Sequence, residues 1–281
     1  MSMLVIQFPD IDPAALAFGP LSIKWYGIAY LVGLLLGWLY IRRFLADRPL
    51  WANETPPFAP QMVDDLLLYI TLGVVVGGRL GFTLFYEPTT YLANPLEIFA
   101  VWKGGMSFHG ALVGCGLAVW LFASRNRVNV WSTMDLCAAA VPLGLLFGRI
   151  ANFINAELWG RATDVSWAVV FCNDRIKAAH GFCPAGEIPR HPSQLYEAAL
   201  EGLVLFIVLR LLTHKFEALK QPGTVTGVFL IGYALARSVA ELFREPHFYV
   251  GPLTAGQLYS LPMLLLGLYF LWRARAAATA S

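Results

Sequence analysis

The residue types best suited to chemistry in this chain follow directly on a long apolar run. Thirteen uncharged residues, 136–148, precede Arg149, and Asn152, Asn155 and Glu157 complete a polar stretch of nine positions. An arginine near the centre of a bilayer costs at least about 2.5–3.5 kcal/mol, so a helix that faces lipid carries such groups only for a reason. The segment therefore predicts either a bound polar ligand or buried charges that pair with one another.

Two later segments carry polar side chains at helical spacing. One stripe consists of Gln194, Glu197 and Glu201. The other consists of Tyr233, Arg237, Glu241 and Arg244. Intervals of three and four residues place each set on one face of a helix. If both faces point inward, they line a polar cavity.

Arginines and glutamates are matched in number among these intramembrane positions. The four arginines are Arg79, Arg149, Arg237 and Arg244, and the four glutamates are Glu157, Glu197, Glu201 and Glu241. Structural ion pairs are the simplest interpretation of any single residue. A cleft rich in guanidinium groups nevertheless suits an anion, and phosphate matches it best.

His109 stands in an otherwise uncharged segment, 104–124, with glycines at 104, 105 and 110. Small neighbours let a ligand approach the backbone closely. A neutral imidazole at this position can accept a proton from a thiol or a hydroxyl. The alternative is a structural histidine that donates to a backbone carbonyl.

The composition indicates what kind of scaffold must position these groups. The 281 residues are 58% hydrophobic and 14% charged, and the mean hydropathy is +0.60. Soluble domains carry about 25% charged residues. These values exclude a soluble globular protein and predict an all-α polytopic membrane protein in a single transmembrane domain, 1–281.

Seven segments are long and apolar enough to be expected as spans of about 20 residues. They are 23–43, 64–86, 105–124, 133–155, 194–213, 224–244 and 253–272. A polar loop, 156–193, separates the fourth from the fifth and is expected to form a small periplasmic head. Its Cys172 and Cys183 can form a disulfide outside the cytoplasm, but the sequence does not decide whether they do.

The basic residues between these spans predict the orientation. Nine lie on one side: Arg42, Arg43, Arg48, Arg125, Arg127, Lys215, Lys220, Arg273 and Arg275. Seven lie on the other and are spread over longer loops: Lys24, Lys103, Arg161, Arg175, Lys177, Arg190 and Arg244. The positive-inside rule then places the N-terminus outside and the C-terminus in the cytoplasm. With this orientation, six spans bring their polar groups to the outer half of the bilayer.

Two other classes of protein were compared with this pattern. A transporter or channel for an anionic metabolite needs polar groups that continue through the inner half, and the segment 253–272 has no charged residue. A purely structural scaffold does not need His109 beside so many arginines. No Cys or His spacing indicates a metal site, and no glycine-rich loop indicates a nucleotide.

Four blocks of sequence carry a family resemblance: 148–160, 104–110, 191–197 and 233–246. The first, GRIANFINAELWG, resembles the signature of the bacterial prolipoprotein diacylglyceryl transferases.

The resemblance implies an inner-membrane enzyme that is open to the periplasmic side and needs no metal or organic cofactor. It would transfer the sn-1,2-diacylglyceryl group of phosphatidylglycerol to the lipobox cysteine of a prolipoprotein signal peptide, releasing glycerol-1-phosphate. Its partners would be these two substrates and membrane lipids, without nucleic acid. Another phosphatidylglycerol-using transferase would differ only in its acceptor.

The resemblance and the chemistry together suggest roles for the polar residues. Arg149 and Arg237 would bind the leaving phosphate, because guanidinium groups stabilise growing negative charge at low dielectric. His109 is the favoured base, with an arginine-stabilised thiolate, Glu197 or Glu241 as alternatives. The residues expected to bind substrate are Tyr26, Arg79, Asn152, Glu157, Gly160, Glu197, Tyr233, Glu241 and Arg244.

Overall fold

The computed structural model describes residues 5–18, 21–246 and 248–279, and it is predominantly helical. The chain divides into two compact units. Unit 1 contains Met1–Leu39 and Cys137–Ser281, and unit 2 contains residues 40–136. The boundaries fall inside two long helices, α1 (Trp25–Ala46) and α5 (Val130–Ile154), so each of these contributes to both units.

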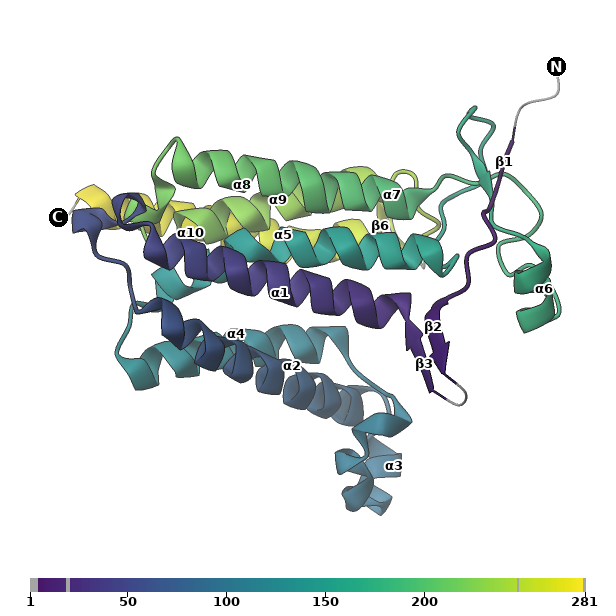
Figure 1. Cartoon of the computed structure of the whole chain (residues 1–281), viewed down its shortest axis with the longest axis horizontal. Coiled ribbons are helices and arrows are strands. Elements are labelled where there is room, and N and C mark those ends of the chain that lie inside the picture. Colours follow the sequence, from purple (N-terminus) through teal and green to yellow (C-terminus); the bar gives the residue numbers. More distant parts are fainter. Residues whose placement is uncertain (1–4, 19–20, 247, 280–281) are drawn as a thin grey trace. The chain divides into compact units, whose positions relative to one another are not determined.

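Unit 1 combines parts of α1 and α5 with three further long helical segments (Figure 1). The first is a continuous stretch of α7 (Ser193–Glu197), the π-helical segment η6 (Ala198–Val204) and α8 (Leu205–His214). The others are α9 (Thr224–Ala240) and α10 (Ala255–Thr279). The short η7 (Ala218–Lys220) connects α8 to α9.

Glycines bring the helices of unit 1 close together. A Cβ atom added at Gly267 of α10 would lie 2.8 Å from the carbonyl oxygen of Gly227 in α9. One added at Gly33 of α1 would lie 3.0 Å from the Cα atom of Gly144 in α5. Small residues at helix contacts are typical of membrane proteins, where apolar side chains gain nothing by leaving lipid.

The part of unit 1 outside the long helices contains short strands and a small apolar core. β1 (Ile6–Gln7) pairs in parallel with β4 (Val169–Val170), and Phe8 packs with Val169, Phe171 and Ala185. β2 (Ala14–Phe18) and β3 (Leu21–Lys24) form a hairpin before α1, and β5 (Tyr249–Val250) and β6 (Leu253–Thr254) form one before α10. Six short strands in the described residues thus modify the purely helical prediction.

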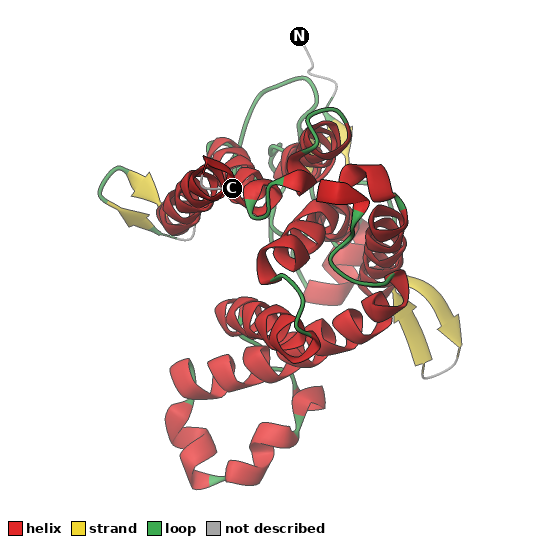
Figure 2. Ribbon diagram, turned by 90° about the vertical axis from the view of Figure 1, so that its left-hand side faces the viewer, coloured by secondary structure: helices red, strands yellow, loops and turns green. Residues whose placement is uncertain are grey.

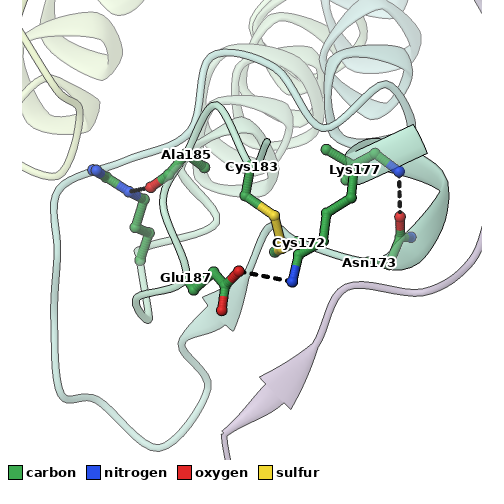
Figure 3. Close-up of a disulfide and its surroundings, with 8 residues drawn as sticks. Cys172, Asn173, Lys177, Cys183, Ala185 and Glu187 are labelled. Carbon is green, nitrogen blue, oxygen red and sulfur yellow. Dashed lines mark hydrogen bonds and ion pairs between the residues drawn. A yellow bond between two sulfur atoms is a disulfide. The ribbon is translucent and has the colours of Figure 1, made fainter. Parts of the chain in front are cut away.

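A disulfide lies in the head segment, 156–193. Cys172 and Cys183 are joined across a Cα–Cα distance of 5.4 Å, on either side of α6 (Asp174–His180) (Figure 3). Beside the bond, Lys177 Nζ lies 2.7 Å from Glu187 Oε1. This hydrogen bond raises the pKa of the Lys177 ammonium group. The structure therefore decides the cysteine pairing that the sequence left open.

Unit 2 is built on α2 (Val63–Phe85) and α4 (Phe108–Asn126), which pack side by side (Figures 1 and 2). A Cβ atom at Gly114 of α4 would lie 2.0 Å from the carbonyl oxygen of Gly73 in α2. The short helices of unit 2 are η1 (Arg48–Leu50), η2 (Ala52–Glu54), η3 (Pro60–Met62), α3 (Pro88–Ala93), η4 (Pro95–Phe99) and η5 (Val101–Lys103).

Every predicted span has a helical counterpart, but only four helices in the described chain are long and apolar enough to cross a membrane. They are Trp25–Ala46, Pro60–Phe85, Val130–Ile154 and Ala255–Thr279. The total of seven spans stays a prediction. α5 begins at Val130, earlier than expected, because Asn129 Oδ1 accepts from the backbone N–H of Trp131 at 2.9 Å and caps the helix. α9 ends at Ala240, and residues 241–243 form a turn.

Candidate active site

A cluster of buried charges lies in unit 1, between α5, the α7–η6 stretch and α9. Arg149 Nη1 lies 3.1 Å from Glu197 Oε2, and Arg149 Nη2 lies 3.0 Å from Glu201 Oε2. The side chains of both glutamates are 0% exposed. Both come from the stretch where the helix changes from α to π, a distortion that often occurs at functional sites.

Arg237 and Arg244 approach the same carboxylates from α9 and the turn that follows it. Arg237 Nη1 pairs with Glu197, and its Nη2 lies 2.9 Å from Glu241 Oε2. Arg244 Nη1 lies 2.9 Å from Glu197 Oε1. Glu197 therefore contacts three arginines. Formally, the three positive charges of the cluster balance the three negative charges of Glu197, Glu201 and Glu241, which limits the cost of burying them.

Exposure differs between the two kinds of group in this cluster. The side chains of Arg149 and Arg237 are 17% and 15% exposed, whereas those of Glu197 and Glu201 are fully buried. The carboxylates thus support the guanidinium groups from the protein interior. Arg149 and Arg237 remain partly exposed, whereas the Arg244 side chain is 6% exposed. Planar guanidinium groups are suited to binding the oxygens of a phosphate.

A second polar cluster is formed by the end of α5 and the start of α1. Asn152 Nδ2 donates to the Tyr26 hydroxyl, and it also lies 3.3 Å from Glu157 Oε1. Asn155 Nδ2 lies 3.4 Å from the same carboxylate oxygen. The structure therefore brings Tyr26, Asn152 and Glu157 together, and their binding of substrate stays a prediction.

After α5 ends, the chain turns back toward this cluster. Ala156 and Leu158 adopt left-handed conformations, with φ of 52° and 58°, which are unfavourable for residues that have a Cβ atom. Between them, the Glu157 N–H donates to the Asn152 carbonyl oxygen at 3.1 Å. Residues held in such conformations often lie at functional sites. Here the strained turn places the Glu157 side chain beside Asn152.

Gly160 permits a close approach between two backbone segments. A Cβ atom there would lie 2.4 Å from the Phe243 carbonyl oxygen and 2.7 Å from that of His191. Gly160 forms a β-bridge with Arg244, and the neighbouring Arg161 N–H donates to Phe243 at 2.9 Å. These contacts position the backbone of Arg244. Whether Gly160 also contacts substrate stays a prediction.

Arg244 reaches the cluster by a different route from the one predicted. The helical stripe placed it on the same face as Arg237, but α9 has already ended at Ala240. Arg244 instead follows a turn and is held by the bridge to Gly160. Tyr233 does lie within α9, one turn before Arg237, and is half-buried.

Arg79 and His109 belong to unit 2. The Arg79 side chain donates hydrogen bonds to five backbone carbonyl oxygens in residues 97–105. This engagement leaves no donor of Arg79 for the substrate-binding role expected of it. His109 is exposed and lies in the first turn of α4, just after the capping residue Ser107.

The family model for prolipoprotein diacylglyceryl transferases matches residues 13–273 of this chain. The chain belongs to the prolipoprotein diacylglyceryl transferase family. Because the described part of the chain contains four apolar helices long enough to cross a membrane, this family member is a multi-pass membrane protein.

Curated relatives of this transferase resemble it over nearly their whole length. One from Phenylobacterium zucineum strain HLK1 is 52% identical over 273 residues, covering 95% of this chain and 94% of the relative. One from Agrobacterium fabrum is 52% identical over 280 residues, covering 98% and 96%. One from Rhizobium meliloti is 49% identical over 284 residues, covering 99% and 98%. Each is named phosphatidylglycerol–prolipoprotein diacylglyceryl transferase.

Two residues that contact this candidate site were missing from the set expected to bind substrate or act in catalysis. Glu201 contacts Arg149 as closely as Glu197 does, and its place in the helical stripe was the signal that could have included it. Gly256 lies against Glu241, and a Cβ atom there would be 2.4 Å from Glu241 Oε2. No sequence pattern indicated Gly256, because the contact joins α10 to the turn that follows α9.

Proposed function

We propose that this transferase moves the sn-1,2-diacylglyceryl group of phosphatidylglycerol to the lipobox cysteine of a prolipoprotein signal peptide. Its curated relatives are named for phosphatidylglycerol and prolipoprotein, and about half of their residues are identical over nearly the full chain. The products are a thioether-linked diacylglyceryl cysteine and glycerol-1-phosphate. This is a first step in the maturation of bacterial lipoproteins.

The reaction is a displacement at carbon. The cysteine sulfur attacks the glycerol carbon that carries the phosphate, a C–S bond forms, and the C–O bond to the phosphate breaks. The electron pair of that bond leaves with the phosphate oxygen, so negative charge grows on the leaving group. The thiol proton must be removed, because a cysteine with a pKa of about 8.5 is mostly protonated at neutral pH.

The observation that carries the proposal is that Arg149 and Arg237 are partly exposed and paired with buried carboxylates. Guanidinium groups held in this way are already oriented when charge develops on the phosphate, so little reorganisation is needed during the reaction. Glu197 and Glu241 orient the arginines, and Arg244 shares Glu197 with them. Both substrates are confined to one membrane plane, which raises their effective concentration.

The second cluster suits the uncharged end of the lipid headgroup. Tyr26, Asn152 and Glu157 present hydroxyl, amide and carboxylate groups within hydrogen-bonding distance of one another. Such groups donate to and accept from glycerol hydroxyls. Tyr233, one turn from Arg237, supplies a further hydroxyl.

The group that removes the proton of the cysteine thiol is proposed from the chemistry of the candidate side chains. His109 is exposed near the beginning of α4, and a neutral imidazole nitrogen can accept a proton from a thiol. Glu197, Glu241 or an arginine-stabilised thiolate are the alternatives. The transferase needs no metal or organic cofactor for this reaction.

The proposal includes the placement of the chain in the inner membrane. The N-terminus is periplasmic, the C-terminus is cytoplasmic, and seven helical segments cross the bilayer as one transmembrane domain. The head segment then lies in the periplasm, with the active site toward that side. The disulfide between Cys172 and Cys183 supports this placement, because such bonds persist in oxidising compartments.

The test incubates purified transferase with phosphatidylglycerol and a lipobox peptide, and measures glycerol phosphate release and the peptide mass. We expect release together with a peptide that gains one diacylglyceryl group. A peptide with serine in place of its cysteine is the control and should remain unmodified. Folded protein that releases no glycerol phosphate would falsify the proposed reaction. Release with any acceptor other than the thiol would favour another phosphatidylglycerol-using transferase.

A further inference from the structure

Arg79 uses its whole guanidinium group to bind backbone. Nε donates to the Ile98 carbonyl at 2.8 Å. Nη1 donates to Gly104 at 2.5 Å and Gly105 at 3.2 Å, and Nη2 donates to Glu97 at 2.6 Å and Ala100 at 3.2 Å. An arginine has five N–H donors, so five carbonyl acceptors satisfy all of them.

The surroundings of Arg79 are those of an enclosed structural group. The residue is 3% exposed, and its guanidinium carbon lies 5.0 Å from the centre of the Tyr91 ring. A phosphate could bind only by displacing carbonyl groups that would then lack their donors. This contrasts with Arg149 and Arg237, whose side chains are partly exposed.

The segment that Arg79 holds leads directly to His109. Residues 97–105 contain the end of η4, all of η5 and two glycines with positive φ, Gly104 and Gly105. The backbone hydrogen bonds within the segment are short-range turns, such as that from the Gly104 N–H to the Val101 carbonyl. Two residues later, the Ser107 N–H donates to the Gly78 carbonyl at 2.8 Å. Ser107 Oγ then accepts from the Gly110 N–H at 3.2 Å and caps α4. Gly78 and Arg79 are adjacent in α2, and their hydrogen bonds thus hold Ser107 and residues 97–105 respectively.

We propose that Arg79 is a positioning residue, which holds residues 97–107 against α2 and so sets the first turn of α4 that carries His109. Its role in the reaction is indirect, and it does not bind the phosphate. The inference rests on the proposed function in one respect, the participation of His109. The attachment of the segment itself is independent of the reaction.

Arg79→Lys separates positioning from phosphate binding. Lysine keeps the positive charge, but its single ammonium group cannot reach carbonyls that surround a planar guanidinium group. Arg79→Gln removes the charge as well. For a positioning role, both variants should lower kcat by about 100-fold, the effect of a small misplacement near the reacting atoms. The KM for phosphatidylglycerol should stay within about twofold, because ground-state binding is unchanged.

Hydrogen exchange gives a readout that does not depend on activity. In both variants, amides of residues 97–107 should exchange faster than in the unaltered protein, without substrate present. Arg125→Lys is the matched control, because Arg125 is an exposed arginine on α4 in the same unit. It should leave exchange and kinetics unchanged.

Each other outcome overturns the inference. A raised KM with residues 97–107 still protected would make Arg79 a substrate ligand. Faster exchange with unchanged kcat would remove its link to the reaction. If the unaltered protein releases no glycerol phosphate, the proposed function fails, whereas the exchange experiment still decides whether Arg79 holds the segment.

Discussion

Glu197 is the residue on which the buried arginines of unit 1 converge. Its two carboxylate oxygens contact Arg149, Arg237 and Arg244, and its side chain is fully buried. Removing one member of a buried ionic cluster leaves a charge that neither water nor a partner compensates. The residue is therefore expected to affect both the stability of the protein and the orientation of the arginines proposed to bind phosphate.

Glu197→Gln should lower both stability and turnover. It leaves three arginines facing two carboxylates, and breaking a buried pair costs about 3–5 kcal/mol. Thermal unfolding in detergent measures the first effect, and glycerol phosphate release measures the second. Glu217→Gln is the control, because Glu217 pairs with Lys220 at an exposed site, where an ion pair contributes about 0–1 kcal/mol. Equal effects of both substitutions would contradict the central role of Glu197.

Gly256→Ala should reduce turnover by about 10- to 100-fold, because small displacements of catalytic groups are costly. The new Cβ atom would lie 2.4 Å from Glu241 Oε2 and would move the carboxylate that supports Arg237. Gly256 is the second residue of α10, and alanine is compatible with a helical backbone. Gly116→Ala is the control, since nothing lies within 4 Å of its added Cβ atom. A normal rate for Gly256→Ala would show that Glu241 is dispensable or moves without loss.

The pairing of α2 with α4 depends on glycines that face each other. Gly73 and Gly77 of α2 meet Gly110 and Gly114 of α4 at distances that leave no room for a Cβ atom. In water, helices associate because association buries apolar surface. In lipid this driving force is missing, and the van der Waals contact that a close approach allows stabilises the helix pair instead. α2 carries Arg79 and α4 carries His109, so the distance between these two helices determines the position of the first turn of α4.

Gly114→Ala should destabilise unit 2 by about 1–3 kcal/mol, as expected for overpacking. Its Cβ atom would lie 2.0 Å from the Gly73 carbonyl oxygen, so the helices must separate. A lower unfolding temperature in detergent and faster proteolysis of residues 40–136 would measure the effect. Gly116→Ala, two residues along the same helix, again serves as the control. Unchanged unfolding of Gly114→Ala would show that the contact relaxes without cost.

The whole chain combines long apolar helices with a folded polar head. The head has its own small core, to which Phe8 from the N-terminal segment contributes, and the disulfide holds α6 in place. Hydropathy and charge bias predict how such a chain is oriented, because translocation of basic loops is unfavourable. The orientation of the protein in the membrane thus depends on all of its spans and loops together.

The predicted orientation is tested by reporters fused to the C-terminus. We expect green fluorescent protein to fluoresce there, and alkaline phosphatase to be inactive, because the first folds in the cytoplasm and the second needs an oxidising compartment. Fusions within the loop around residue 127 should behave in the same way. Active alkaline phosphatase at the C-terminus would reverse the topology and move the head segment to the cytoplasm.

The sequence by itself determined the helical membrane class, the approximate positions of the helices and most of the residues that gather in unit 1. These follow from local properties, since apolar length and helical period are visible along the chain. The tertiary structure alone decided that Glu197 meets three arginines and that Arg244 arrives from a turn. It also decided that Arg79 binds backbone carbonyls. Such pairings depend on the directions of side chains from distant segments and on backbone acceptors, which every residue has and no sequence pattern distinguishes.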